Sequence, residues 1–581
     1  MLERGISREL AARRASNIRD LTCAVHLALP AGPDDPISGH IELAFLLTDT
    51  STPLVLDFDP DAAGTVHEVA INGARIAPLI GHGHIVIAAA ALQPGRQIVR
   101  IAFTAGNGPL NRRTDHLYTI FVPARAHEAL PCFDQPDIKA RWTLSLDLPE
   151  GWTAVSNAAL RIAQPQPDFP VERRQRLVFA ETRPLPTYLF AFAAGAFQVD
   201  TAMRGERTMR LFHIGADEML VSASRDTIFD GHAEALTWME DYTAIPYPFD
   251  TFDIVLLPAF QFTGMEHPGA LFYGASALLL HQGATRQQQL ARAHVIAHET
   301  AHLWFGDLVT MTWFDDVWMK EVLANLMAAR IVNPQFPEID HDLRFLHAHY
   351  PGAYDVDRTA GTHPIRQPLD NLRDAASLYG AIVYLKSPIV FRQLELQMGE
   401  ERLRTALRRY LTRYAYGNAA WPDLVELIRT QGFDDAERWN RLWIEEAGRP
   451  GTPCGARRQR RCGGVVHTAQ RSATEHSKPT DVEHTQRRRS PRRRRYRCHA
   501  SRITSRSRRR ARAAAVSGRR TRRSDRTDPD LDRQRHRRRH RARGSIGAGL
   551  RAAERRWARL RRAPSRRAEP SMAAHASAAT A

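Results

Sequence analysis

A change in composition near Pro450 constrains this chain more than any other feature, because it limits the part that can build a core. Residues 451–581 hold 39 Arg, one Lys and nine acidic residues, a net charge of +31. Residues 1–450 hold 41 basic and 54 acidic residues, a net charge of −13, and the two parts together give the +18 of the whole chain. The basic segment has almost no periodic apolar residues and cannot bury a core. We therefore expect residues 1–450 to fold and residues 451–581 to form a disordered, Arg-rich tail.

The Arg-rich segment admits two further interpretations. It is either a nucleic-acid-binding arm or the product of reading a GC-rich gene in the wrong frame. Arg outnumbers Lys by 39 to 1 there, although the preceding residues use both, which favours the frameshift. Any binding of nucleic acid is expected to be non-specific, to depend on salt and to require this segment alone.

Two domains are expected in the first 450 residues, because the chain is too long for one core. Residues 1–205 carry short apolar runs bounded by Gly, Pro, Asn and Asp, which are typical of an antiparallel β domain. These runs span residues 40–50, 53–60, 96–106, 117–123, 141–149 and 188–197. Residues 206–450 are expected to form a mixed α/β domain, with a strand, a turn and a strand over 252–274. Its helical segments span residues 217–242, 285–306, 317–331, 378–399 and 400–417.

Cysteine content and the N-terminal residues bear on the compartment. Five Cys residues are scattered along the chain without a CxxC pair, which argues against a disulfide framework. The first 20 residues lack the apolar segment of a secretory signal, and no stretch approaches the roughly 18 apolar residues that a membrane helix needs. We expect a cytoplasmic monomer without a membrane partner.

The segment from His298 to His302 is an HExxH motif inside a helical pattern. Histidines four residues apart lie on the same face of a helix, so both imidazoles can reach one ion while Glu299 lies beside it. A catalytic zinc site needs a third protein ligand and an open position for water. Eighteen residues separate His302 from Glu321, which lies on the next helical segment. This spacing predicts one zinc ion on His298, His302 and Glu321, a gluzincin site.

The motif has two other interpretations. A metzincin requires Gly and His three and six residues after the second His, where Phe305 and Leu308 stand, and is excluded. In the other interpretation no metal is bound, and His298 and His302 are core histidines on a helix that also carries a Glu. Glu321, at the spacing that a gluzincin requires of its third ligand, argues against this interpretation. His294 is expected to be a packing residue.

Several segments resemble the M1 family of zinc aminopeptidases. Residues 298–324, HETAHLWFGDLVTMTWFDDVWMKEVLA, are similar to the zinc-binding signature of that family. Residues 131–149, which begin PCFDQP, and residues 185–197 are similar to its N-terminal domain. The resemblance extends from about residue 40 to 450. It implies a β-rich N-terminal domain and a thermolysin-like catalytic domain.

The resemblance also implies the roles of further residues. Residues 263–267, TGMEH, are similar to the GxMEN exopeptidase motif and differ from it at the first and last positions. By this likeness Glu266 would accept the α-ammonium of the substrate, next to Gly264 and Met265. Residues 378–388, LYGAIVYLKSP, are similar to the family's tyrosine segment, which places Tyr384 at the catalytic Tyr.

The expected activity is hydrolysis of the N-terminal bond of peptides that have a free N-terminus. Glu299 would act as general base and acid, and Tyr384 would stabilise the oxyanion. The alternatives are a non-catalytic peptide-binding protein with the same fold and a related zinc hydrolase that opens epoxides.

Overall fold

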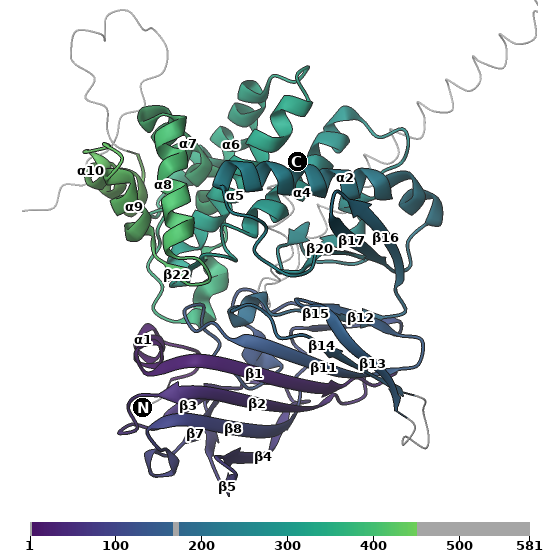
Figure 1. The fold of residues 1–581 in the computed structure, drawn as a ribbon. Helices are drawn as coiled ribbons and strands as arrows, with labels where there is room; N and C mark the ends of the chain where they lie inside the picture. Colours follow the sequence, from purple (N-terminus) through teal and green to yellow (C-terminus); the bar gives the residue numbers. More distant parts are fainter. Residues whose placement is uncertain (1–2, 167–173, 450–581) are drawn as a thin grey trace, which may run out of the picture. The chain divides into compact units, whose positions relative to one another are not determined.

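A computed structural model describes residues 3–166 and 174–449 of the chain. The expected Arg-rich tail, residues 451–581, lies outside the described residues. The described part is β-rich up to about Gly195 and contains both helices and strands afterwards (Figure 1). This order confirms the fold class expected from the sequence.

The largest sheet has eight strands in the order β13-β14-β11-β1-β2-β8-β4-β5. All its neighbours are antiparallel except β1 and β11, which run parallel. In β1 alternate residues such as Cys23, Val25 and Leu27 are buried, so one face of the strand covers the core. The strands are β1 (Ile18–Ala28), β2 (Ser38–Leu47), β4 (Thr65–Ile71), β5 (Ala74–Ile76), β8 (Gly95–Thr104), β11 (Arg141–Pro149), β13 (Leu160–Gln166) and β14 (Arg174–Phe179).

Two smaller sheets complete the N-terminal domain. One has the order β12-β15-β10-β9 and the other β3-β7-β6. The Trp142 ring on β11 stacks on Phe190 with ring centroids 4.4 Å apart, which joins the largest sheet to the segment that leads into β15. The strands are β3 (Leu54–Asp57), β6 (Leu79–Gly81), β7 (His84–Ile87), β9 (Leu110–Arg112), β10 (His116–Thr119), β12 (Thr153–Ser156) and β15 (Phe192–Gly195).

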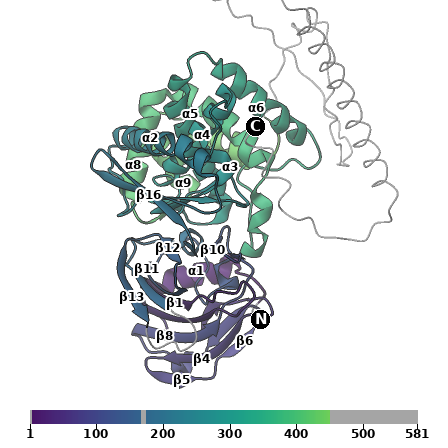
Figure 2. The same ribbon diagram turned by 90° about the vertical axis from the view of Figure 1, so that its right-hand side faces the viewer.

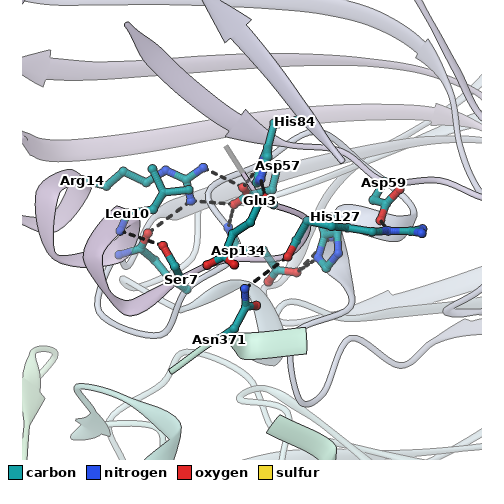
Figure 3. A network of polar contacts seen from close by, with 12 residues as sticks. Glu3, Ser7, Leu10, Arg14, Asp57, Asp59, His84, His127, Asp134 and Asn371 are labelled. Atoms are coloured by element: carbon teal, nitrogen blue, oxygen red, sulfur yellow. Dashed lines mark hydrogen bonds and ion pairs between the residues drawn. The ribbon is translucent and has the colours of Figure 1, made fainter. Parts of the chain in front are cut away.

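A buried ionic network ties α1 (Arg8–Asn17) to the three-stranded sheet (Figure 3). Arg14 on α1 donates two hydrogen bonds, of 2.8 and 2.6 Å, to the Asp57 carboxylate at the end of β3. His84 on β7 lies 3.0 Å from the same carboxylate. The backbone N–H of Asp134 also donates to Asp57, and the other end of the network is the pair His127–Asp134, 2.6 Å apart. Because each charge has a partner, the network can lie inside the domain.

The second domain contains a five-stranded sheet in the order β16-β17-β18-β20-β19. Strands β17, β18 and β20 are parallel, and β16 and β19 are antiparallel edges. Strand β16 belongs to this sheet, so the boundary expected at residue 205 falls inside the β16–β17 hairpin. The strands are β16 (Gln198–Arg204), β17 (Arg207–His213), β18 (Asp253–Leu257), β19 (Gly264–Met265) and β20 (Ala270–Gly274).

Helices cover this sheet, and α2 and α4 lie over its strands in both views (Figures 1 and 2). Thr285 caps α4: its hydroxyl accepts from the backbone of Gln288, whose side chain accepts from the backbone of Thr285. Helix α4 packs on α5, the most buried helix of the domain. The helices are α2 (Glu218–Thr243), α3 (Ala275–Leu278), α4 (Arg286–His302), α5 (Val317–Val332), α6 (His341–Asp357), α7 (Ser387–Met398), α8 (Glu400–Arg413), α9 (Trp421–Arg429) and α10 (Ala436–Asn440).

Two short strands pair in parallel: β21 (Thr310–Met311), which lies within the α4–α5 connection, and β22 (Asn418–Ala419). Among the helices that the structure describes, none combines the length and the apolar character needed to cross a membrane.

Candidate active site

The two histidines of the HExxH motif lie one turn apart at the end of α4. Their Nε2 atoms are 3.1 Å apart, and the rings are perpendicular with centroids 4.6 Å apart. His302 is buried, whereas the side chain of His298 is 15% exposed. Two imidazole nitrogens that face each other at this distance can bind a single ion between them.

Backbone contacts fix the orientation of His302. Its Nδ1 lies 3.0 Å from the carbonyl oxygen of Phe305, so Nδ1 carries the proton and Nε2 presents a lone pair. Burial lowers the pKa of His298, which favours a neutral imidazole there. Burial also opposes the charge of His302, but the carboxylates of Glu266 and Glu321 outweigh it and raise the pKa of that ring. A neutral ring at either position offers an Nε2 lone pair that suits a cation.

Glu321 approaches the same point from α5. Its Oε2 atom is 3.7 Å from the Nε2 atoms of both His298 and His302. Ligand atoms about 2.0–2.1 Å from a tetrahedral zinc ion lie about 3.3 Å from one another. The distance between the two Nε2 atoms, 3.1 Å, is slightly shorter than this, and the two distances from Glu321 Oε2, 3.7 Å each, are slightly longer. The donor set and its spacing therefore fit zinc.

Glu299 is the other carboxylate beside the two imidazoles. It forms a compact group with His298 and His302, with one donor atom of each residue within 4.8 Å of the others. Burial raises the pKa of Glu299 to about 8, and the nearby Glu266 carboxylate adds to this rise. Gly264 on β19 crosses directly over it: a Cβ at this position would lie 2.3 Å from Glu299 Oε1. A glycine is required for this close approach.

Glu266 follows β19 and points into the same cluster, but it already has a cationic partner. Lys320 Nζ on α5 donates a hydrogen bond to Glu266 Oε1 and lies 3.1 Å from Glu321 Oε1. Burial alone would raise the pKa of Glu266, but the Lys320 ammonium, helped by His302 when that ring is protonated, lowers it to about 2. Burial opposes the charge of Lys320, yet Glu266 and Glu321 raise its pKa well above the usual value. Glu266 and Lys320 therefore form a buried ion pair.

Lys320 was not among the residues predicted from the sequence. A signal was present, because Lys320 interrupts an otherwise apolar helix one residue before Glu321. A lysine at a position that the helix buries requires an acidic partner. Which acid it meets depends on the approach of β19 to α5, and the sequence does not show this approach.

Met265 and Tyr384 are the two remaining residues predicted for the site. Met265 is buried in an apolar group that also contains Ile120 and Val122 from the N-terminal domain. Tyr384 lies on a π-helical turn, Ile382–Lys386, with its ring 6.3 Å from that of Tyr379. Burial raises the pKa of Tyr384 well above its usual value, and the Glu321 carboxylate adds to the rise.

His294, which the sequence analysis assigned to packing, lies one turn before His298 on α4. Burial lowers the pKa of His294 to about 3, so it is neutral at physiological pH. Among the described residues, the group of potential metal ligands on this helix consists of His298, Glu299 and His302.

Comparisons with known proteins agree with this arrangement. Residues 228–443 match the model of the peptidase family M1 domain, and residues 108–189 match the peptidase M1 N-terminal domain. The chain is 32% identical over 334 residues to a puromycin-sensitive aminopeptidase of Caenorhabditis elegans, a match that covers 57% of this chain and 34% of that protein. It is 29% identical over 400 residues to aminopeptidase N of Streptomyces lividans, covering 66% and 46% of the two chains.

A third relative, probable aminopeptidase 2 of Sulfurisphaera tokodaii, is 30% identical over 339 residues, 58% of this chain and 42% of the relative. The chain thus spans less than half the length of each of these relatives. The matched segments include part of the N-terminal β domain and most of the domain that carries the histidines, Glu299 and Glu321. This chain belongs to peptidase family M1.

Proposed function

We propose that this chain is a zinc-dependent aminopeptidase that hydrolyses the N-terminal bond of peptides. One observation carries the proposal: two imidazole nitrogens and the Glu321 carboxylate converge within 3.1 to 3.7 Å, with a second carboxylate, Glu299, beside them. The relatives, which are named aminopeptidases, support the same class of reaction.

We assign one zinc ion to His298, His302 and Glu321. When bound, zinc would lower the pKa of a water molecule and polarise the scissile carbonyl. The tautomer of His302, set by the Phe305 carbonyl, and the neutral state of His298 support this assignment. Lys320 contacts the outer oxygen of Glu321 and leaves its other oxygen directed at the imidazoles.

Glu299 performs the proton transfers. Burial raises the pKa of Glu299 to about 8, close to neutral pH, so the carboxyl group can both take up and return a proton during the reaction. Glu299 accepts a proton from the attacking water and then donates it to the nitrogen of the leaving amine. The backbone of Gly264 restricts the Glu299 side chain to this position.

Tyr384 and the residues around β19 position the substrate. Tyr384 remains protonated at every physiological pH, so its hydroxyl donates a hydrogen bond to the oxygen that becomes negative during attack. The binding site for the first residue of the peptide is lined by Gly264, Met265 and Glu266. Glu266 faces the amino end of the substrate, where an ammonium would be the natural partner of a carboxylate.

The test compares the full chain with the variant Glu299→Gln, using leucine para-nitroanilide as substrate. We expect hydrolysis by the zinc-loaded protein, loss of activity in the presence of a chelator and its return when zinc is added back. Glu299→Gln should lower kcat by about 10²- to 10⁴-fold, the usual contribution of a general base, with unchanged zinc content. The matched control is Glu206→Gln, which changes an exposed residue of the β16–β17 turn.

Two outcomes would contradict the proposal. One is full activity in Glu299→Gln at equal zinc content. The other is no hydrolysis by a folded protein that carries one zinc ion per chain.

A further inference from the structure

Residues 4–8, which we call the strap, pair with residues 370–372 of the second domain. Ser7 and Asn371 form an isolated antiparallel bridge. Two backbone hydrogen bonds flank this bridge, one of 2.8 Å from the N–H of Arg8 to the carbonyl oxygen of Asp370 and one of 2.9 Å from the N–H of Leu372 to the carbonyl oxygen of Ile6. The strap therefore connects the first residues that the structure describes to a loop of the domain that carries the candidate active site.

Buried side chains reinforce this pairing. Asn371 is 4% exposed, and its Nδ2 donates a hydrogen bond of 3.2 Å to the carbonyl oxygen of Arg4 (Figure 3). Ile6 is 1% exposed and belongs to the same apolar cluster as Leu372 and Leu378. Displacement of the strap would expose this apolar surface and leave buried polar groups without partners, which is costly.

Both ends of the strap are anchored in the N-terminal domain. The carbonyl oxygen of Glu3, just before it, lies 3.1 Å from Nε2 of His84, a member of the buried ionic network (Figure 3). Ser7, near its other end, caps α1, and its hydroxyl accepts a hydrogen bond from the backbone of Leu10. A segment fixed at both ends can hold the loop that it contacts.

The loop that the strap holds leads directly to Tyr384. It continues into the 3₁₀ helix Leu372–Leu378, and three residues join this helix to the π-helical turn that carries Tyr384. The backbone N–H of Tyr384 donates to the carbonyl oxygen of Gly380, which lies in this link. On the other side of Tyr384, Lys386 is held by a 2.8 Å ion pair with Asp357. The position of Tyr384 thus depends on two anchors, and the strap supplies the first.

We propose that the strap positions Tyr384, with Ile6 and Arg8 as positioning residues for catalysis. This inference rests on the proposed function, in which the Tyr384 hydroxyl stabilises the oxyanion. The strap restricts the 3₁₀ helix and the turn after it to one arrangement, so the hydroxyl is in place before the substrate binds. Residues in another domain thereby raise kcat without contacting the substrate.

The test variant opens the strap and preserves α1. Arg8 is the first residue of α1, and Ser7 before it is extended, with a ψ of 152°. Proline is tolerated at such a position, so Arg8→Pro removes the backbone donor of the strap without breaking the helix. The substitution also removes an ion pair with Asp315, which contributes little because the Arg8 side chain is 48% exposed. Ile6→Ala, combined with it, removes the buried side chain.

Hydrogen exchange followed by mass spectrometry measures the strap directly. In Ile6→Ala/Arg8→Pro the amides of residues 372–386 should exchange at least about tenfold faster than in wild type, because a buried side chain and a hydrogen bond no longer oppose local opening. The amides of β11 should exchange at the wild-type rate. Arg8→Pro alone, the milder variant, should give about a two- to tenfold increase. Glu218→Pro is the matched control, since Glu218 is exposed and is likewise the first residue of its helix, α2.

Kinetics on leucine para-nitroanilide test whether the strap acts through Tyr384. The double variant should lower kcat by at least about tenfold and change KM by less than about threefold, because the oxyanion forms only during the reaction. In the Tyr384→Phe background the same two substitutions should lower kcat by less than about twofold, because the hydroxyl that they displace is already absent. A general loss of structure would lower kcat by the same factor in both backgrounds.

Two results would overturn the inference. One is unchanged exchange of residues 372–386 in an Ile6→Ala/Arg8→Pro protein that melts cooperatively. The other is an equal loss of kcat with and without the Tyr384 hydroxyl. Absence of hydrolysis by the wild-type protein would count against the proposed function, whereas the exchange measurement requires no turnover and still tests the strap.

Discussion

The close approach of Gly264 to Glu299 makes a sharp prediction about a single methyl group. Gly264 lies on the edge strand β19 and pairs with Tyr273. A Cβ at residue 264 would lie 2.3 Å from Glu299 Oε1 and 2.6 Å from its Cδ and Cγ. Ordinary contacts begin at 3.4 Å. The Gly264→Ala variant must therefore move either the Glu299 carboxylate or the strand by about 1 Å.

A displacement of this size is enough to impair proton transfer. A misplacement of about 1 Å in a catalytic arrangement lowers the rate by about 100-fold, so we expect kcat of Gly264→Ala to fall by about 100-fold or more. Overpacking should also lower the free energy of unfolding by about 1–3 kcal/mol. The metal ligands lie on α4 and α5, so zinc content should stay at one ion per chain.

The assay measures kcat and KM on leucine para-nitroanilide, zinc by mass spectrometry and the melting temperature. Gly274→Ala is the matched control, because Gly274 ends the neighbouring strand β20 and its nearest atom to an added Cβ, the carbonyl oxygen of Phe262, is 3.4 Å away. Activity of Gly264→Ala within about threefold of wild type would refute the reasoning, since a 1 Å shift costs far more. Loss of zinc in the same variant would refute it as well.

Three further predictions concern single side chains. Glu321→Gln should weaken zinc binding by at least about 100-fold, beyond the effect of an outer-shell residue, as measured by competition with a chromogenic chelator; binding as tight as in wild type would exclude Glu321 as a ligand. Tyr384→Phe should lower kcat by about 10²- to 10³-fold with little change in KM, and steady-state kinetics that show a change in KM alone would contradict the oxyanion role. His127 has a pKa of about 8 in the folded protein, because the hydrogen bond and the charge of Asp134 outweigh burial, against 6.5 for the free side chain. It therefore contributes about 2 kcal/mol of stability below pH 6.5, which is lost as the pH rises through about 8. Urea unfolding below pH 6.5 and above pH 8 should show this loss in the free energy of unfolding of the wild-type protein, and His127→Gln should not show it.

Periodicity predicted the two kinds of domain but could not assign every strand to a sheet. Alternation of apolar residues marks a strand whichever sheet it joins. The boundary expected at residue 205 includes β16 in the β-rich domain, whereas β16 pairs with β17 in the five-stranded sheet. The parallel pairing of β1 with β11 joins residues about 120 positions apart, such as Val25 and Leu144, and no local pattern encodes it.

The candidate zinc site could be predicted because its spacing is local. The turn of α4 places His298 beside His302, and the short connection to α5 returns Glu321 to them. Only residue types and offsets were needed for this inference. The contact of Lys320 with Glu266 and the closeness of Gly264 to Glu299 depend instead on how β19 and the residues after it approach the two helices.

The ion pair of Lys320 with Glu266 shows why the same motif can support different specificities. A motif records that a carboxylate is present, but its action depends on the charge already next to it. Glu266 has Lys320 beside it, and the same ammonium also contacts Glu321, so one cation is shared by two carboxylates. Lys320 breaks the apolar pattern of α5 at the residue before a candidate metal ligand. Because a buried lysine opposes folding unless it is paired, the burial of Lys320 depends on its contacts with Glu266 and Glu321.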